Sequence, residues 1–142
     1  MIRVLVVDDE PSLREMLSIA LKRAQFDVTV EGGVRPATER IRSALAPFPL
    51  VITDLVMPDG SGMEVLAAAK ARAASTEVIV MTAHSTVEAA IEAMRSGAYD
   101  FIVKPFSPRH MLAQAEKAIE KHRLFSENQK LRAQLQRYTP RD

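Results

Sequence analysis

Five polar residues follow short apolar runs, at points where a strand would give way to a loop. Three are carboxylates, one is a hydroxyl and one is an ammonium; they are Asp8, Asp9, Asp54, Thr82 and Lys104. In an open parallel sheet the carboxyl ends of all strands share one edge, and ligands bind in the crevice there. We therefore expect the five side chains to meet in one pocket that is equipped to bind a hard cation and a phosphoryl group.

The carboxylates of this pocket predict a magnesium site. Asp8 and Asp9 are adjacent, and neighbouring carboxylates repel one another unless a cation lies near them. Magnesium binds through one or two carboxylates together with phosphate oxygens and water, and Asp54 would supply a third carboxylate. Taken singly, Asp8 and Asp9 could merely cap a helix and Asp54 could accept hydrogen bonds from loop amides. Those explanations do not account for Thr82 and Lys104 at the same edge.

The remaining polar groups suit a bound phosphoryl group. Lys104 would hold its amine over the pocket near Asp54, and Thr82 offers a hydroxyl beside the small residue Ala83, whose N–H an anion can approach. Such a clamp is what phosphoryl transfer requires. The chain has no cysteine, no GxxxxGK loop and no serine elbow, so a carboxylate is the candidate nucleophile. Asp54 is that candidate.

Strand-like and helical patterns alternate along the whole chain. The expected strands cover residues 2–7, 28–30, 50–53, 77–81 and 100–103. The helical patterns begin at Pro11, near Ala37, after Gly62, at Val87 and at Pro108. This order predicts an α/β fold with five parallel strands, right-handed crossovers and helices on both faces of the sheet.

Apolar residues recur at helical spacing in the second and fourth helical patterns. Ala37, Ile41 and Leu45 mark the second helix, and Val87, Ala90, Ile91 and Met94 line one face of the fourth. Gly97 fits the left-handed position that closes the fourth helix.

The last helix is longer than a small domain can cover. No glycine or proline interrupts the chain between Pro108 and about Tyr138, a span of roughly 45 Å at 1.5 Å per residue. Its second half has a 4-3-4-3 spacing of a/d positions at Leu124, Asn128, Leu131, Leu135 and Tyr138. A single Asn at an a position favours a parallel two-stranded coiled coil. We expect dimerisation through this helix, the alternative being a solvated tail.

Composition excludes several functional classes. The 142 residues are 47% hydrophobic and carry a net charge of +1, which suits one globular domain with no general demand for nucleic acid or membrane. The absence of cysteine excludes disulfides and zinc–thiolate sites. The acidic end of the first apolar run is unlike a signal peptide, and no stretch is long enough to cross a bilayer, so we expect a cytoplasmic protein.

Four segments together resemble the receiver domain of bacterial two-component response regulators. They are VLVVDDE, ITDLVMPDGSGMEVL, VIVMTAHS and GAYDFIVKPF. The resemblance implies a CheY-like, flavodoxin-like fold in which a sensor histidine kinase phosphorylates Asp54. It also implies that Asp9 binds Mg²⁺ directly, that Asp8 acts more indirectly, and that the backbone carbonyl of Val56 completes the protein ligands.

The same resemblance implies a conformational switch. Thr82 would move toward the phosphoryl group, and an aromatic residue on the last strand would turn inward behind it. That residue is Phe101, where many members have tyrosine, so steric coupling is retained without the tyrosine hydroxyl. A cis peptide bond is expected between Lys104 and Pro105.

The segment TAHSTVEAA and the helix ending in ENQKLRAQL are similar to NtrC-type activators. Those proteins join a receiver through a helical linker to an ATPase module and a DNA-binding helix-turn-helix. We therefore interpret residues 1–121 as a receiver and 122–139 as a coiled-coil linker of a longer transcription regulator. Homodimerisation would use the last helix and also the face formed by the fourth helix and fifth strand.

Two other functions compete with this interpretation. Aspartate-nucleophile phosphatases carry a DxD motif in which the second Asp is a general acid. In this chain the corresponding position is Val56, which cannot transfer a proton. A phosphorylation-independent interaction module would not need five intact pocket residues. We expect no enzyme activity beyond self-phosphorylation and autodephosphorylation.

Overall fold

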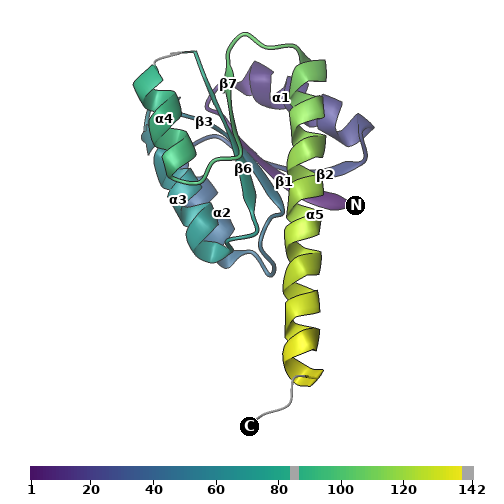
Figure 1. Cartoon of the computed structure of the whole chain (residues 1–142). Helices are drawn as coiled ribbons and strands as arrows, with labels where there is room; N and C mark the ends of the chain where they lie inside the picture. Colours follow the sequence, from purple (N-terminus) through teal and green to yellow (C-terminus); the bar gives the residue numbers. More distant parts are fainter. Residues whose placement is uncertain (84–86, 139–142) are drawn as a thin grey trace.

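The computed structural model describes residues 1–83 and 87–138 and confirms the predicted alternation of strands and helices (Figure 1). The elements in chain order are β1 Ile2–Val7, α1 Pro11–Arg23, β2 Phe26–Glu31, α2 Val34–Ser43, β3 Leu50–Asp54, β4 Val56–Met57, β5 Gly60–Ser61, α3 Gly62–Arg72, β6 Glu77–Thr82, α4 Val87–Arg95, β7 Asp100–Val103 and α5 Pro108–Tyr138. The sequence did not predict the two-residue strands β4 and β5, which form a small antiparallel hairpin after β3.

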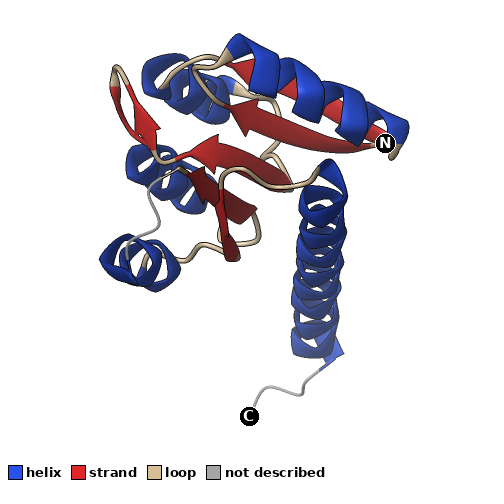
Figure 2. Ribbon diagram, turned by 90° about the horizontal axis from the view of Figure 1, so that it is seen from above, coloured by secondary structure: helices blue, strands red, loops and turns tan. Residues whose placement is uncertain are grey.

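Five parallel strands form one sheet in the order β2-β1-β3-β6-β7. Helices α2, α3 and α4 cover one face of this sheet, while α1 and α5 cover the other (Figures 1 and 2). The chain therefore has the predicted α/β architecture, with the shorter of the expected edge strands extended to Phe26–Glu31.

The central strands are apolar because both of their faces are buried. In β1, Leu5 and Val7 contact the core under α2, α3 and α4, whereas Val4 and Val6 contact the core under α1 and α5. Parallel strands covered on both faces are expected to read as continuous apolar runs rather than as alternating ones. Their shared direction brings all strand carboxyl ends to one edge of the sheet.

The prediction for the end of the second helix was wrong. Helix α2 ends at Ser43, so Leu45 lies beyond the helix instead of within it and is fully exposed. The guanidinium of Arg72 in α3 donates hydrogen bonds to the carbonyl oxygens of Ile41, Arg42 and Ala44 at 2.8–3.0 Å. Because these carbonyls have an external donor, the helix can stop before Leu45.

Helix α4 packs on the sheet through Ala93, and the larger residues of its predicted apolar face stay outside. Val87, Ile91 and Met94 are 72%, 45% and 47% exposed, whereas Ala93 is fully buried. A small residue at the contact lets the helix approach the sheet closely and leaves the larger apolar side chains outside. Gly97 has the predicted left-handed conformation, with φ of 101°.

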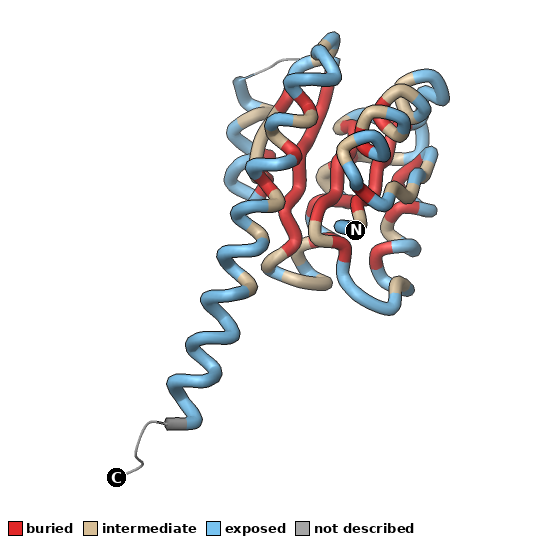
Figure 3. Tube along the Cα trace, turned by 90° about the vertical axis from the view of Figure 1, so that its right-hand side faces the viewer, coloured by how far each residue is buried: buried red, intermediate tan, exposed pale blue. Residues whose placement is uncertain are grey.

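Helix α5 is continuous over 31 residues, and only its first half belongs to the globular body. Met111, Ala115 and Ala118 are completely buried against the sheet. Farther along, the helix extends away from the body and is exposed (Figures 1 and 3). None of the helices in the described part of the chain is both long and apolar enough to span a bilayer.

Candidate functional site

The strand register gathers the predicted site residues at the carboxyl edge of the sheet. Asp54 is the last residue of β3 and pairs with Met81, the neighbour of Thr82 in β6. Asp8 directly follows β1 and Lys104 directly follows β7. Residues that lie far apart in sequence therefore end on adjacent strands, as the α/β pattern predicts.

Three carboxylates form a compact cluster at this edge. Oxygen atoms of Asp8, Asp9 and Asp54 all lie within 4.8 Å of one another. Asp8 and Asp54 are buried, with exposed fractions of 0% and 6%, while Asp9 is exposed. A set of carboxylate oxygens that is open to solvent on one side fits a cation such as Mg²⁺, which prefers oxygen ligands and retains several waters.

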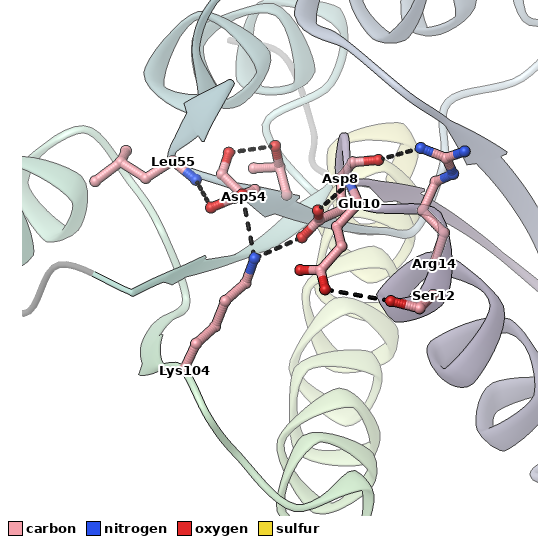
Figure 4. Close-up of polar contacts among 8 residues, drawn as sticks. Asp8, Glu10, Ser12, Arg14, Asp54, Leu55 and Lys104 are labelled. Carbon is pink, nitrogen blue, oxygen red and sulfur yellow. Dashed lines mark hydrogen bonds and ion pairs between the residues drawn. The ribbon is translucent and has the colours of Figure 1, made fainter. Parts of the chain in front are cut away.

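The ammonium of Lys104 bridges two of the carboxylates (Figure 4). Its Nζ atom lies 2.7 Å from Oδ2 of Asp8 and 3.2 Å from Oδ2 of Asp54. Burial by itself would lower the pKa of Lys104, but the hydrogen bonds and negative charges of Asp8 and Asp54 outweigh burial and raise it. Lys104 therefore stays charged and offsets part of the cluster's negative charge.

Asp54 is held in an environment that disfavours its charge. Burial raises the pKa of its carboxyl group, the charge of Lys104 opposes that shift, and the charge of Asp8 adds to it. The Oδ1 atom accepts a hydrogen bond from the backbone N–H of Leu55 at 2.8 Å, while Oδ2 faces Lys104. The carboxylate is thereby fixed in direction at the rim of the sheet, as a nucleophile or a metal ligand needs to be.

Backbone contacts around Asp8 hold the first carboxylate in place (Figure 4). Its Oδ1 atom accepts a hydrogen bond from the N–H of Glu10 at 2.8 Å. Nη1 of Arg14, in the first turn of α1, donates to the backbone oxygen of Asp8 at 2.7 Å. The sequence reasoning missed Arg14, whose only signal is its position one helical turn after the acidic run.

Gly62 was also missed, although it lies against the candidate acceptor. Its N–H donates to the carbonyl oxygen of Leu55 at 2.8 Å. A Cβ atom at this position would lie 2.0 Å from the backbone oxygen of Asp54, which is an impossible contact. The glycine of the DGSG segment is therefore needed for the close passage of α3 beneath the loop that follows Asp54.

The other predicted site residues lie on the same edge or just below it. Thr82 is completely buried, and its backbone oxygen accepts the N–H of Lys104 at 2.8 Å. Phe101 is partly buried in β7 and packs on the core under α3 and α4. Val56 lies in β4, and its side chain is 56% exposed. The cis peptide bond predicted between Lys104 and Pro105 is present.

His84 follows Thr82 closely and lies outside the described residues. His122 in α5 forms a hydrogen bond between its Nδ1 atom and the carbonyl oxygen of Ser75 at 2.7 Å, at the edge of the sheet opposite the carboxylates.

Comparison with known proteins agrees with this architecture. Residues 4–116 match the family model described as the response regulator receiver domain. The chain is 36% identical to the response regulator protein PilR of Pseudomonas aeruginosa over 142 residues, covering 92% of this chain and 32% of PilR. It is 37% identical to the C4-dicarboxylate transport transcriptional regulatory protein DctD of the same organism, covering 94% of this chain and 28% of DctD.

Solved structures show the same relationship. The beryllofluoride-activated NtrC4 receiver domain dimer matches with a TM-score of 0.79 and 36% identity, covering 86% of this chain and 99% of that one. A response regulator receiver domain protein from Clostridium thermocellum matches with a TM-score of 0.82 and 26% identity, covering 88% and 99%.

The chain belongs to the response regulator receiver family. Within that family it is similar to the receivers of NtrC-type transcription activators, which are phosphorylation-dependent switches of two-component systems. The chain spans about a third of the length of these two curated relatives.

Proposed function

We propose that Asp54 is the phosphoacceptor of this receiver and that a sensor histidine kinase is the phosphoryl donor. The observation that carries the proposal is the placement of Asp54: a buried, oriented carboxylate that shares one ammonium with Asp8. Asp9 and the backbone carbonyl of Val56 complete the proposed magnesium site with Asp8 and Asp54.

In the proposed reaction an oxygen of Asp54 attacks the phosphorus of the donor's phosphohistidine. A P–O bond forms, the P–N bond breaks, and its electron pair returns to the imidazole nitrogen. Asp8, Asp9 and Asp54 would hold the Mg²⁺, which would supply positive charge beside the phosphoryl oxygens. Lys104 supplies an ammonium on another side, and the hydroxyl of Thr82 is proposed to donate to a phosphoryl oxygen.

Phosphorylation is proposed to act as a switch by changing the charge at this edge. The acyl phosphate carries about −1.5 to −2 charges in place of the single negative charge of the Asp54 carboxylate, so the ammonium is drawn away from its pairing with Asp8. Movement of Thr82 toward the phosphoryl group would leave space that Phe101 fills. Because Phe101 already packs against the core cluster that includes Ala93 of α4, its rotation would reach the exposed face that carries Val87.

The direct test is to locate the modification. After incubation with acetyl phosphate and Mg²⁺, mass spectrometry should find one phosphoryl group on the peptide that contains Asp54, stable to acid and labile to base. Asp54→Asn should remain unmodified and folded. Asp27→Asn, an exposed position in β2, is the matched control and should be modified like the wild type. Full modification of Asp54→Asn would show that the acceptor lies elsewhere.

We also propose that the chain forms a homodimer through α5. Leu124, Leu131 and Leu135 are 53%, 59% and 67% exposed, at the spacing that a coiled coil would bury. In a parallel pair, Glu127 would occupy a g position and Arg132 the e′ position five residues farther along, which gives an attractive pairing between helices.

A second dimer contact is proposed on the α4 and β7 face. Here Val87, Ile91, Met94 and Val103 are between 42% and 72% exposed. The ATPase and DNA-binding modules of NtrC-type relatives would follow the linker at 122–139 in the full-length cytoplasmic protein. Receiver chemistry on Asp54, rather than turnover of an external substrate, is the proposed extent of its catalysis.

A further inference from the structure

Helix α2 begins without a capping side chain of its own. Its N-cap residue is Gly33, and the first N–H groups of a helix need acceptors from outside it. Asp59 provides them from 25 residues farther along the chain. Its Oδ1 atom accepts the N–H of Val34 at 2.9 Å, and its Oδ2 atom accepts the N–H of Arg35 at 3.0 Å.

Asp59 belongs to the loop that follows the candidate acceptor. It lies between β4 and β5, in the hairpin whose first residue is Val56. The side chain of Met57 is buried in the core under α2 and α3, which anchors the hairpin at one point. The contact of Asp59 with α2 anchors the hairpin at a second point, within the turn itself.

The fit between Asp59 and α2 depends on the absence of a side chain at position 33. A Cβ atom on Gly33 would lie 2.9 Å from Oδ2 and 3.1 Å from Oδ1 of Asp59. The φ angle of Gly33 is −168°, an extended value that any residue can adopt, so the glycine is needed here for space. The two amide hydrogen bonds, from Arg35 and Val34, lower the pKa of Asp59.

We propose that Asp59 is a positioning residue for the metal site. Its carboxylate ties the loop 55–61 to the N-terminus of α2 and thereby fixes the backbone carbonyl of Val56 relative to Asp54. This inference rests on the proposed function, because Val56 acts as a ligand only if the site binds Mg²⁺. Without the tie, metal binding would have to order a looser loop, which weakens affinity.

The test is a titration of the whole chain with Mg²⁺ alone, followed by the backbone amide signals of residues 54–62. Asp59→Ala should weaken binding roughly tenfold, the lower end of the range for residues that orient metal ligands. Asp59→Asn should weaken it less, because one oxygen acceptor remains. Gly33→Ala should act in the same direction from the side of α2. The double variant should bind no more weakly than Asp59→Ala, since both changes remove one contact.

A second readout needs no metal. In the metal-free protein, amide hydrogen exchange at Val34, Arg35 and residues 55–61 should be faster in Asp59→Ala than in the wild type. Thr76→Val is the control for general destabilisation, because it removes the 2.7 Å hydrogen bond from Thr76 to the Phe48 carbonyl at the opposite edge of the sheet. Its Mg²⁺ affinity should equal that of the wild type.

The outcomes separate this inference from the function on which it rests. Wild-type affinity in Asp59→Ala and Gly33→Ala, with weaker binding in Asp9→Asn, would overturn the role of Asp59 and leave the metal site standing. An equal loss in Thr76→Val would also overturn it. If the wild-type chain does not bind Mg²⁺, the proposed metal site and the role of Asp59 both fail.

Discussion

The Nζ atom of Lys104 lies 2.7 Å from Oδ2 of Asp8, a residue 96 positions earlier in the chain. The same ammonium is 3.2 Å from Asp54, so its shorter contact is with the carboxylate that is completely buried. A buried charge requires a partner. Lys104 therefore supplies positive charge to both carboxylates, as the cation proposed to bind at this site would also do.

Removing this ammonium should make the fold depend more strongly on Mg²⁺. In Lys104→Met the carboxylates of Asp8 and Asp54 lose their shared partner. We expect the metal-free free energy of unfolding to fall by about 1–3 kcal/mol, below the value for a fully buried pair because Lys104 is partly exposed to water. Added Mg²⁺ should then raise the unfolding temperature more than it does in the wild type.

The matched control for this prediction is Lys121→Met. Lys121 forms an ion pair with Glu77 at the opposite edge of the sheet, with 3.4 Å between Nζ and Oε2. Its loss should leave the increment produced by Mg²⁺ unchanged. Thermal unfolding of the three proteins with and without Mg²⁺ makes the comparison, and equal increments in all three would contradict the role assigned to Lys104.

The raised pKa of Asp54 predicts how stability changes with pH. Burial raises this pKa above its ordinary value of 3.8, so the folded state binds the proton at a higher pH than the unfolded state does. Ionised Asp54 therefore lowers the free energy of unfolding above its folded pKa, and this cost disappears as pH falls through that pKa. Asp54→Asn should be more stable than the metal-free wild type at neutral pH.

Urea unfolding of both proteins at a series of pH values measures this difference. The two free energies of unfolding should converge as pH decreases toward 3.8, because protonated Asp54 and the asparagine that replaces it are both neutral. Effects of Asp59, whose pKa is lowered, are present in both proteins and cancel in the difference. A difference that grows on acidification would show that the ionised form is the favoured one.

Gly62 should tolerate no side chain. Gly62→Ala would place a Cβ atom 2.0 Å from the backbone oxygen of Asp54 and 2.9 Å from Cα of Leu55, so the loop has to move. We expect a loss of about 3 kcal/mol or more in the free energy of unfolding. In Gly32→Ala, by contrast, the new Cβ atom meets the end of the flexible Arg14 side chain at 3.0 Å, and the cost should be about 1 kcal/mol or less. Urea unfolding measures the loss of stability in each variant. Equal losses in Gly62→Ala and Gly32→Ala would contradict the conclusion that Gly62, unlike Gly32, lacks room for a side chain.

The proposed coiled coil predicts a specific loss of dimerisation. Leu131→Glu places a charge at a d position and removes an apolar side chain from each helix, which should weaken the dimer by about 3 kcal/mol, or roughly a hundredfold in Kd. Ala133→Glu introduces the same charge on the outer side of the same helix and should have little effect on the Kd of the dimer. Sedimentation equilibrium of the wild type, of both variants and of a chain ending at 121 measures the dimer dissociation constant. A monomeric wild-type chain would rule out the coiled-coil interface.

Much of the fold and site follows from local pattern and one rule of topology. Apolar runs of strand length alternate with helical spacing, and parallel strands place their carboxyl ends on one edge. Those two facts were enough to predict that Asp8, Asp54 and Lys104 lie together. The spacing within α4 was less informative, because it identifies an apolar side without showing whether Ala93 or Ile91 meets the sheet.

The sequence by itself determined which residue types reach the carboxyl edge, since strand periodicity and strand ends are local properties of the chain. Only the tertiary structure decided that Lys104 approaches Asp8 more closely than Asp54, that Asp59 caps α2, and that Gly62 passes beneath the loop after Asp54. These contacts join segments distant in sequence, and their geometry depends on how whole elements pack, which no local spacing encodes.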